Sequence, residues 1–231
     1  MASALVHESL LDSPPSESAS ATRPGWEIAC LTVYARAVTD FDASRLDELN
    51  GPVAAYCSPG LIELVAAGQT DLFCPPDGGP PTINAPALLA RPYDGDFVLS
   101  TRIEVELRST FDAGALLLWR DQRTWAKLAV ELSPEGRATI VTVVTDARSD
   151  DCNSTALDGS SADVRLARLG DAFAFHFHSA DRWHLIRHFS LGAATFRPGF
   201  LAQSPTGKGC TARFRHTRFE TRRLHDIRDG T

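Results

Sequence analysis

The sequence contains no pair of cysteines with the spacing of a metal or redox motif. Its five cysteines are far apart, and no C-x-x-C pair occurs: they are Cys30, Cys57, Cys74, Cys152 and Cys210. This spacing gives no support to a zinc ribbon or a thioredoxin-type site. An odd number of scattered cysteines is typical of free thiols in a reducing compartment.

The sequence also lacks a long apolar run and a secretory leader. No run approaches the roughly 20 apolar residues that a membrane-spanning helix needs. The N-terminus has no basic region followed by an apolar region, which a secretory signal would show. We therefore expect a cytoplasmic protein that does not enter a membrane.

Positive charge is not in excess. The chain has 23 Lys and Arg against 29 Asp and Glu, for a net charge of -6. Such a chain has no global field that would hold a nucleic acid backbone. A local exception near the C-terminus is accompanied by no known nucleic-acid-reading motif, so we expect a solvated edge or tail and no nucleic acid partner: Arg213, Arg215, Arg218, Arg222, Arg223 and Arg228.

The 231 residues are enough for one β-sandwich with a tail. Residues 1–25 are rich in Ser and Pro and poor in apolar residues, which predicts a disordered tail. Residues 26–50 form an N-terminal extension of uncertain structure, in which residues 42–49 have helical spacing behind Asp42. The main domain is expected over residues 51–222, followed by a basic tail over residues 223–231.

Short apolar segments separated by turn residues dominate the main domain. Residues 97–107 alternate between apolar and polar side chains, as a half-buried strand does. Residues 71–86 and 146–161 read as long loops. Further strands are predicted at residues 61–65, 115–120, 125–132, 138–145, 164–169, 172–178, 183–189, 194–202 and 212–219. About ten short strands with tight connections predict an all-β, antiparallel sandwich of two sheets.

The order of short motifs resembles the regulation of enolase protein family, a domain of unknown function, over about residues 50–222. The motifs include Thr70-Asp71-Leu72-Phe73, Asp112-Ala113-Gly114, Trp125-Ala126-Lys127-Leu128, Trp183-His184-Leu185-Ile186-Arg187 and Ser204-Pro205-Thr206-Gly207. The resemblance implies a jelly roll of the concanavalin A-like lectin/glucanase superfamily, whose concave sheet often binds sugars. It implies no known reaction. Asp151-Cys152 stands where the family usually has an aromatic residue, and Ser179-Ala180-Asp181-Arg182 replaces a Ser-x-Asp-Gly turn.

One predicted strand carries the best candidate site. Period two places Trp125, Lys127 and Glu131 on one face, while Leu128 and Val130 face the core. We expect the first face to be solvated or to line a groove, where a Trp ring can support a sugar and charged groups can bind its hydroxyls. The alternative is an ordinary charge ladder beside a partly exposed Trp.

A second hairpin carries another polar set. If its loop has four residues, His178 pairs with Trp183 and His176 lies opposite Leu185, and Arg187 shares their face. A His-x-His strand can bind a metal, but no third ligand stands nearby. We expect no metal and no cofactor.

The sequence therefore favours a non-catalytic domain that binds a carbohydrate. The predicted ligand-binding residues are Trp125, Lys127, Glu131, Trp183 and Arg187, with Trp119 and Arg120 behind them. Two alternatives stay open. A glycosidase would need paired carboxylates, and the Glu-x-Asp-x-x-Glu strand that is typical of jelly-roll glucanases is missing. A protein-interaction module or homodimer would use an exposed sheet.

Overall fold

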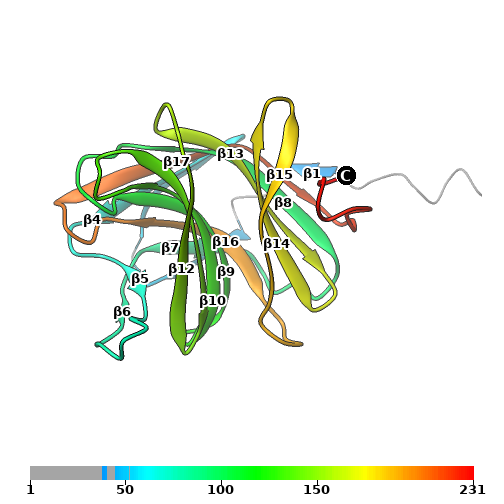
Figure 1. The fold of residues 1–231 in the computed structure, drawn as a ribbon, viewed down its shortest axis with the longest axis horizontal. Helices are drawn as coiled ribbons and strands as arrows, with labels where there is room; N and C mark the ends of the chain where they lie inside the picture. Colours follow the sequence, from blue (N-terminus) through cyan, green and yellow to red (C-terminus); the bar gives the residue numbers. More distant parts are fainter. Residues whose placement is uncertain (1–37, 41–44, 52) are drawn as a thin grey trace, which may run out of the picture. The chain divides into compact units, whose positions relative to one another are not determined.

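The structure is a computed structural model that describes residues 38–40, 45–51 and 53–231 (Figure 1). The tail predicted over residues 1–25 and most of the extension predicted over residues 26–50 lie outside the described residues. The described residues form strands and turns, and none of them belongs to a helix that is long and apolar enough to cross a membrane.

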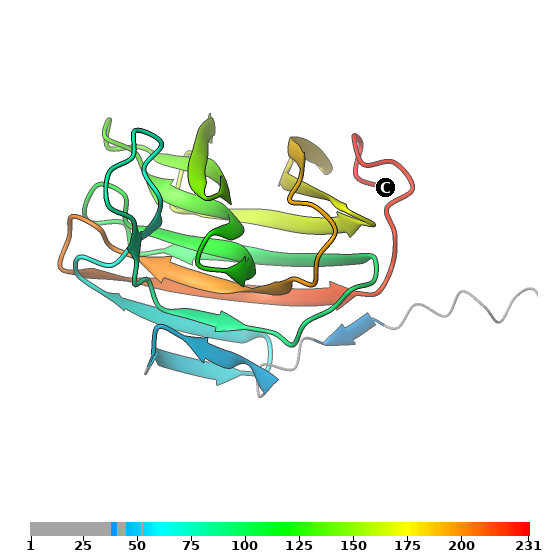
Figure 2. The ribbon, with the colours of Figure 1, turned by 90° about the horizontal axis from the view of Figure 1, so that it is seen from below.

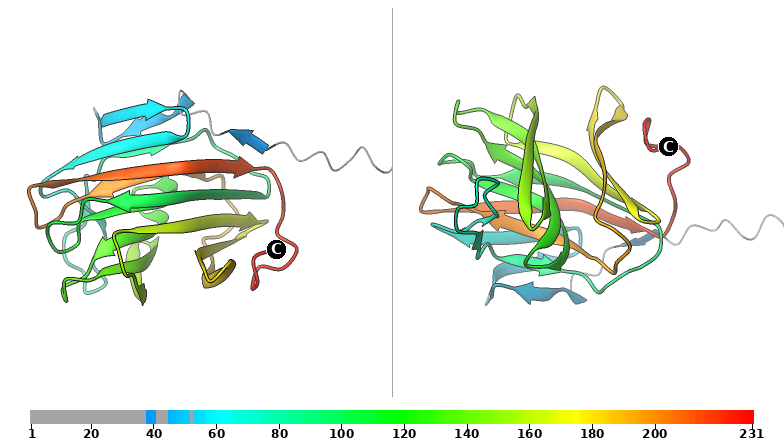
Figure 3. Two further views of the ribbon diagram at one scale, coloured as in Figure 1. Left: turned by 90° about the horizontal axis from the view of Figure 1, so that it is seen from above. Right: turned by 60° about the horizontal axis from the view of Figure 1, so that its bottom comes forward.

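Sheet A has eight antiparallel strands in the order β15-β14-β13-β8-β17-β4-β3, with β1 paired to β17 (Figure 3, left). Its strands are β1 (Val38–Asp40), β3 (Ala54–Ser58), β4 (Leu61–Ala67), β8 (Phe97–Val105), β13 (Ser161–Leu169), β14 (Ala172–Ser179), β15 (Arg182–Ser190) and β17 (Gly209–Glu220).

Sheet B has seven antiparallel strands in the order β12-β11-β10-β9-β16-β7-β2 (Figure 2). Its strands are β2 (Asp47–Leu49), β7 (Ala87–Leu89), β9 (Ala113–Asp121), β10 (Thr124–Leu132), β11 (Ala138–Asp146), β12 (Arg148–Ala156) and β16 (Arg197–Gln203). A separate hairpin of β5 (Leu72–Phe73) and β6 (Thr82–Ile83) lies between β4 and β7 in the sequence.

The main core lies between the two sheets and is rich in Phe and Leu. Fully buried members include Phe97, Phe175, Phe200 and Phe214. Each such side chain contributes about 1.5–3 kcal/mol relative to its exposed state. The predicted two-sheet antiparallel sandwich is therefore confirmed.

The outer face of sheet A is polar beyond Val98 of β8. From Leu99 onward the side chains of β8 alternate between buried and partly exposed, and the partly exposed Arg102 and Glu104 pair with charges on neighbouring strands. Arg213 binds Glu63 at 2.7 Å and Glu106 at 3.0 Å, and Arg215 binds Glu104 at 2.9 Å. The arginines at positions 213 and 215 thus belong to a ladder of alternating charges and form no open basic stripe.

Three local predictions were wrong. Residues 146–161 were expected to be a loop, but β12 forms an edge strand there, because most of its polar side chains stay exposed while its backbone pairs with β11. Residues 47–49 form a strand rather than part of a helix, since their backbone pairs with β7. The loop over residues 71–86 contains the β5–β6 hairpin, and this hairpin lies beside sheet B (Figure 1).

Candidate functional site

The outer face of sheet B carries four of the predicted ligand-binding residues. Trp125 lies directly opposite Trp119 of β9, so both indoles share the face of Lys127 and Glu131. The face is not the solvated or open surface that was expected. Trp125 is 0% exposed, Trp119 7% and Lys127 2%.

Residues 71–86 cover this face. Leu72, Cys74 and Ala85 from this segment are buried in one apolar cluster with both indoles. Two hydrogen bonds between Cys74 and Ser149 of β12 fix the cover to the sheet: Ser149 Oγ accepts from Cys74 N at 2.9 Å, and Cys74 O accepts from Ser149 N at 2.8 Å. Trp119 and Trp125 therefore fill a second core, and neither presents an open ring to a ligand.

The Lys127 ammonium group has polar partners beneath this cover. Its ammonium group donates to Leu72 O at 2.8 Å and to Gln203 Oε1 at 2.7 Å, and it lies 3.7 Å from Asp71 Oδ1. Its neighbours on the same face include Ala115 and Ala129, whose small side chains leave room for the lysine. Lys127 thus ties the cover to strand β16.

Glu131 lies on the same face of β10, toward the other end of the strand from Trp125, and is half-buried. The pKa of its carboxyl is raised from 4.5 to about 7, chiefly by burial; the Lys127 ammonium lowers it, and the carboxylates of Asp71 and Asp151 raise it. We call Asp71, Lys127, Glu131, Asp151 and Gln203 the Glu131 cluster.

The loop before β9 borders this cluster. Gln203 Nε2 donates to Phe111 O at 3.4 Å, and Leu132 O accepts from Phe111 N at 2.8 Å. Phe111 has a φ of 69° and is 37% exposed. A non-glycine residue in the left-handed region is strained, and such strain occurs often at functional sites. Sequence reasoning did not select Phe111, because periodicity carries no sign of a positive φ.

The Glu131 cluster has the chemistry of a polar binding or proton-transfer site. A carboxyl whose pKa lies near 7 is present in both forms at neutral pH, so it can donate or accept a hydrogen bond. Asp71 and Gln203 were also missed as site residues. The signal for Asp71 was its place in the Thr70-Asp71-Leu72-Phe73 motif, but nothing in the sequence placed that motif against β10.

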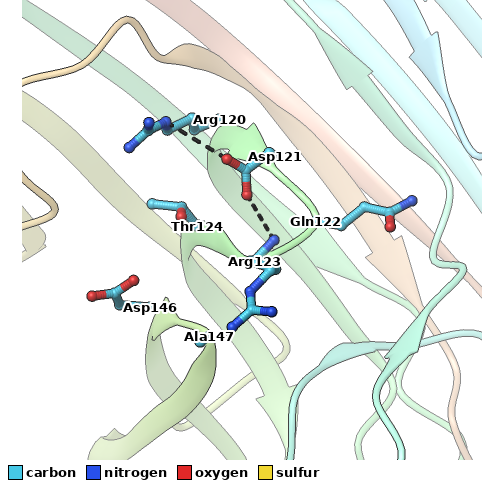
Figure 4. A pocket seen from close by; sticks show the side chains of 7 residues that line it. All are labelled: Arg120, Asp121, Gln122, Arg123, Thr124, Asp146 and Ala147. Carbon is cyan, nitrogen blue, oxygen red and sulfur yellow. Dashed lines mark hydrogen bonds and ion pairs between the residues drawn. The ribbon is translucent and has the colours of Figure 1, made fainter.

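Arg120 lies at the opposite end of sheet B from Glu131. It borders a shallow depression of about 540 Å³ at the tips of the β9–β10 and β11–β12 hairpins (Figure 4). Its guanidinium lies 3.6 Å from the Asp121 carboxylate, which also accepts from Arg123 N at 2.8 Å (Figure 4). The side chains of Arg120 and Asp121 are both about half exposed. The depression is open, and no residue of the Glu131 cluster lines it, so Arg120 does not join that cluster.

Trp183 and Arg187 lie in sheet A, and they do not share a face. The predicted pairings of His178 with Trp183 and of His176 with Leu185 are confirmed. A bulge between Phe175 and His176 then shifts the register, so Arg187 pairs with Phe175. A slip of one residue moves a side chain to the other face of a sheet.

Arg187 therefore points between the sheets. It donates to Asp150 O of β12 at 3.1 Å and forms an ion pair of 2.9 Å with the Asp150 carboxylate. Trp183 stays on the outer face, where its ring lies 4.3 Å from Cζ of Arg165. The predicted ligand-binding residues thus occupy separate places, and only Lys127 and Glu131 belong to one polar cluster.

His176 is fully buried, and its Nε2 lies 2.7 Å from the carbonyl oxygen of Ile227. Burial lowers its pKa to about 4. Within the described ranges no three His, Cys, Asp or Glu side chains come together as metal ligands would.

A family model of proteins of unknown function, DUF1349, matches residues 49–222. The chain belongs to this family. The match carries no activity with it, and the likeness to the regulation of enolase protein family stays a prediction. No curated protein matches the chain.

Solved structures share the fold. A functionally unknown protein from Saccharomyces cerevisiae superposes with a TM-score of 0.72 at 19% identity, covering 79% of this chain and 99% of the yeast chain. The GH43 protein BlXynB from Bacillus licheniformis gives a TM-score of 0.57 at 12% identity, covering 71% of this chain and 34% of that one. A xylan beta-1,4-xylosidase from Bacillus halodurans gives 0.54 at 12% identity, with coverages of 76% and 39%. The chain thus spans little more than a third of these two bacterial proteins, and the DUF1349 domain shares with them a sandwich fold.

Proposed function

We propose that the chain is a carbohydrate-binding domain and that its ligand contacts the Glu131 cluster at the edge of the cover on sheet B. The observation that carries the proposal is Glu131, a half-buried carboxyl with a pKa of about 7 beside two further carboxylates. Sugar hydroxyls donate and accept hydrogen bonds at once, and a carboxyl in both protonation states can serve either role.

Phe111 would supply the apolar part of this site. Sugar-binding sites combine a few polar groups with an aromatic surface. The buried indoles of Trp119 and Trp125 cannot play that part while residues 71–86 cover them. Phe111 is exposed, and its carbonyl is held by Gln203 of the cluster. This assignment moves the proposed aromatic contact from the indoles to the Phe111 ring.

The raised pKa of Glu131 also favours a second function, the hydrolysis of glycosides. A carboxyl with a pKa near 7 beside a second carboxyl group is the arrangement that acid/base hydrolysis of glycosides requires. In that case Glu131 would protonate the leaving oxygen, and Asp71 or Asp151 would act as the second carboxylate. Binding and hydrolysis make different demands on Glu131, because only hydrolysis needs its proton to be transferred.

Calorimetric titration with xylo-oligosaccharides and cello-oligosaccharides tests the proposal. Glu131→Ala should weaken binding by about tenfold, the value of one lost hydrogen bond, while Glu131→Gln should retain most of it. A matched control is Glu104→Ala, which removes a carboxyl from the outer face of sheet A. Equal affinity for wild type and Glu131→Ala would refute the assigned site, and no heat with any of these sugars would refute the ligand class.

Product analysis with the same sugars separates the two functions. A binding domain leaves the oligosaccharides intact at every pH. A hydrolase cleaves them, and both Glu131→Ala and Glu131→Gln abolish the cleavage while Glu131→Gln still binds.

A further inference from the structure

The outer face of sheet A carries a second covered region, formed by the chain after β17. Residues 221–231 turn back beside β15 (Figure 1). Leu224 is buried against Val98 and Ala167, and Ile227 O lies 2.7 Å from His176 Nε2. Gly230 N donates to Asp226 O at 2.9 Å, which closes a turn. We call residues 224–231 the C-terminal cover.

Arg165 lies beneath this cover and is 2% exposed. Its guanidinium stacks on the Trp183 indole, with Cζ 4.3 Å from the ring centre. Its Nε and Nη2 atoms are buried and have no hydrogen-bond partner among the described residues. Burial lowers the pKa of Arg165 only to about 10, so the group keeps its charge at neutral pH.

Another buried arginine of sheet A, Arg168, has the hydrogen-bond partners that Arg165 lacks. Arg168 is 5% exposed, and its guanidinium donates to the carbonyl oxygens of Gly170, Tyr93 and Ala194. A buried cation that keeps its charge needs such partners, because burial removes it from water. Arg165 has been buried without them.

The register places further polar groups beside Arg165. One row runs across the outer face from β17 to β14, in which Arg218 pairs with Ser100, Ser100 with Arg165 and Arg165 with His176. The nearby Glu220 carboxylate lies 3.3 Å from Arg222. The Arg222 guanidinium lowers the pKa of Arg165 and the Glu220 carboxylate raises it, so both signs of charge lie near the site.

The unpartnered atoms define the chemistry of a ligand. Nε and Nη2 are the two donors on one side of the guanidinium fork, which matches two oxygens of a carboxylate or phosphate. His176 Nδ1 is buried and unpartnered as well. If Nε2 donates to Ile227 O, Nδ1 of the neutral ring is an acceptor, which suits a hydroxyl group.

We propose that Arg165, with Ser100 and His176, forms an anion-binding site for a small hydroxylated molecule that carries a carboxylate or phosphate group. The C-terminal cover occupies the entrance and moves aside when the anion binds. This site is independent of the one on sheet B.

Gly230 shows how closely the cover fits over the site. It has a φ of +79°, and a Cβ at this position would clash with Arg165 Nη2 and with Cβ of Trp183. Only glycine allows both the turn and this approach. Most other residues of the cover are exposed, and Leu224 provides its main apolar anchor. A cover with so small an anchor can open while the sandwich stays folded.

The test uses the full chain and its Gly230→Ala variant, in which the cover is displaced. Calorimetric titration compares glucuronate, glucose 6-phosphate and inorganic phosphate with neutral glucose. Apparent affinity for a covered site scales with its open fraction, so Gly230→Ala should bind the anions about tenfold more tightly than wild type. Leu224→Ala, which loosens the apolar anchor instead, should shift affinity in the same direction. Preference between glucuronate and the two phosphates identifies the oxyanion.

Arg165→Met in the Gly230→Ala background removes the guanidinium and keeps an apolar side chain. Anion binding should disappear in this variant and persist in Arg213→Met, a matched change on the same face of sheet A. Anion binding that survives Arg165→Met would overturn the proposal. So would the absence of anion binding in both Gly230→Ala and Leu224→Ala.

Discussion

Replacing Glu131 by Gln should remove a pH dependence from the stability of the protein. The Glu131 carboxyl has a pKa of about 7 in the folded chain against 4.5 for the ordinary group, chiefly because burial penalises its charge. No described hydrogen bond of the Glu131 side chain is lost in the variant, and Gln has nearly the same shape as the protonated acid. The substitution therefore isolates the cost of ionising this group.

The sign and size follow from linkage between protonation and folding. Since the folded state holds the proton more tightly, the contribution of this group is fully present below pH 4.5 and is lost as the pH rises through about 7. At about 1.4 kcal/mol per pH unit, the shift corresponds to a loss of roughly 3 kcal/mol, reduced by the partial exposure of the side chain. The pKa of His176 is lowered to about 4, so this group reduces the stability of the fold as the pH falls below 6.5. Wild type and Glu131→Gln both contain His176, so its effect cancels when the two are compared.

Urea unfolding followed by tryptophan fluorescence between pH 4.5 and 8 measures this difference. The unfolding free energy of wild type should fall relative to Glu131→Gln over that interval, and the two curves should be parallel above it. Glu104→Gln, on the outer face of sheet A, controls for the change in net charge. Parallel curves across the whole interval, or a carboxyl resonance of Glu131 that titrates near pH 4.5, would refute the argument.

Two further predictions concern the groups that hold the loops around this cluster. Lys127→Met should destabilise the fold by about 1–3 kcal/mol, because Leu72 O and Gln203 Oε1 lose their donor, and faster amide hydrogen exchange in residues 71–86 would reveal it. Asp112→Ala should cost about 3 kcal/mol in urea unfolding, because its buried carboxylate accepts from two backbone amides and from Ser204 Oγ at 2.6 Å. Unchanged unfolding free energy in either variant would contradict these contacts.

Periodicity predicted the strands and their faces well, because the side chains of a strand alternate whatever surrounds it. The register of β10 confirms that Trp125, Lys127 and Glu131 lie on one face of the sheet. Periodicity could not predict that Trp125 is buried, since the cover comes from residues 71–86, which precede β10 by some forty positions. One signal was present: residues 115–118 are apolar on both faces of β9, which is typical of a strand covered on both sides.

Register errors account for the misplacement of Arg187. Counting from the turn gave the correct partners for Trp183 and Leu185, but the bulge beyond His176 inserts one residue. A bulge of this kind depends on backbone geometry and leaves no mark in a pattern of apolar and polar residues. The ion pairs of Arg213 and Arg215 were equally hidden, because Glu63, Glu104 and Glu106 are distant from them in the sequence.

Each of the two covered faces of the sandwich contains a buried cation, and the two cations differ in their hydrogen-bond partners. The ammonium group of Lys127 on sheet B has a carbonyl oxygen, an amide oxygen and a carboxylate within 3.7 Å, and these partners compensate for its burial. On sheet A, Arg165 keeps two buried donors without partners in the described part of the chain. A satisfied cation stabilises its cover, whereas an unsatisfied one favours any anion that can reach it. The contacts of Lys127 thus hold residues 71–86 against sheet B, and the two unpartnered donors of Arg165 are the observation on which the proposed anion site rests.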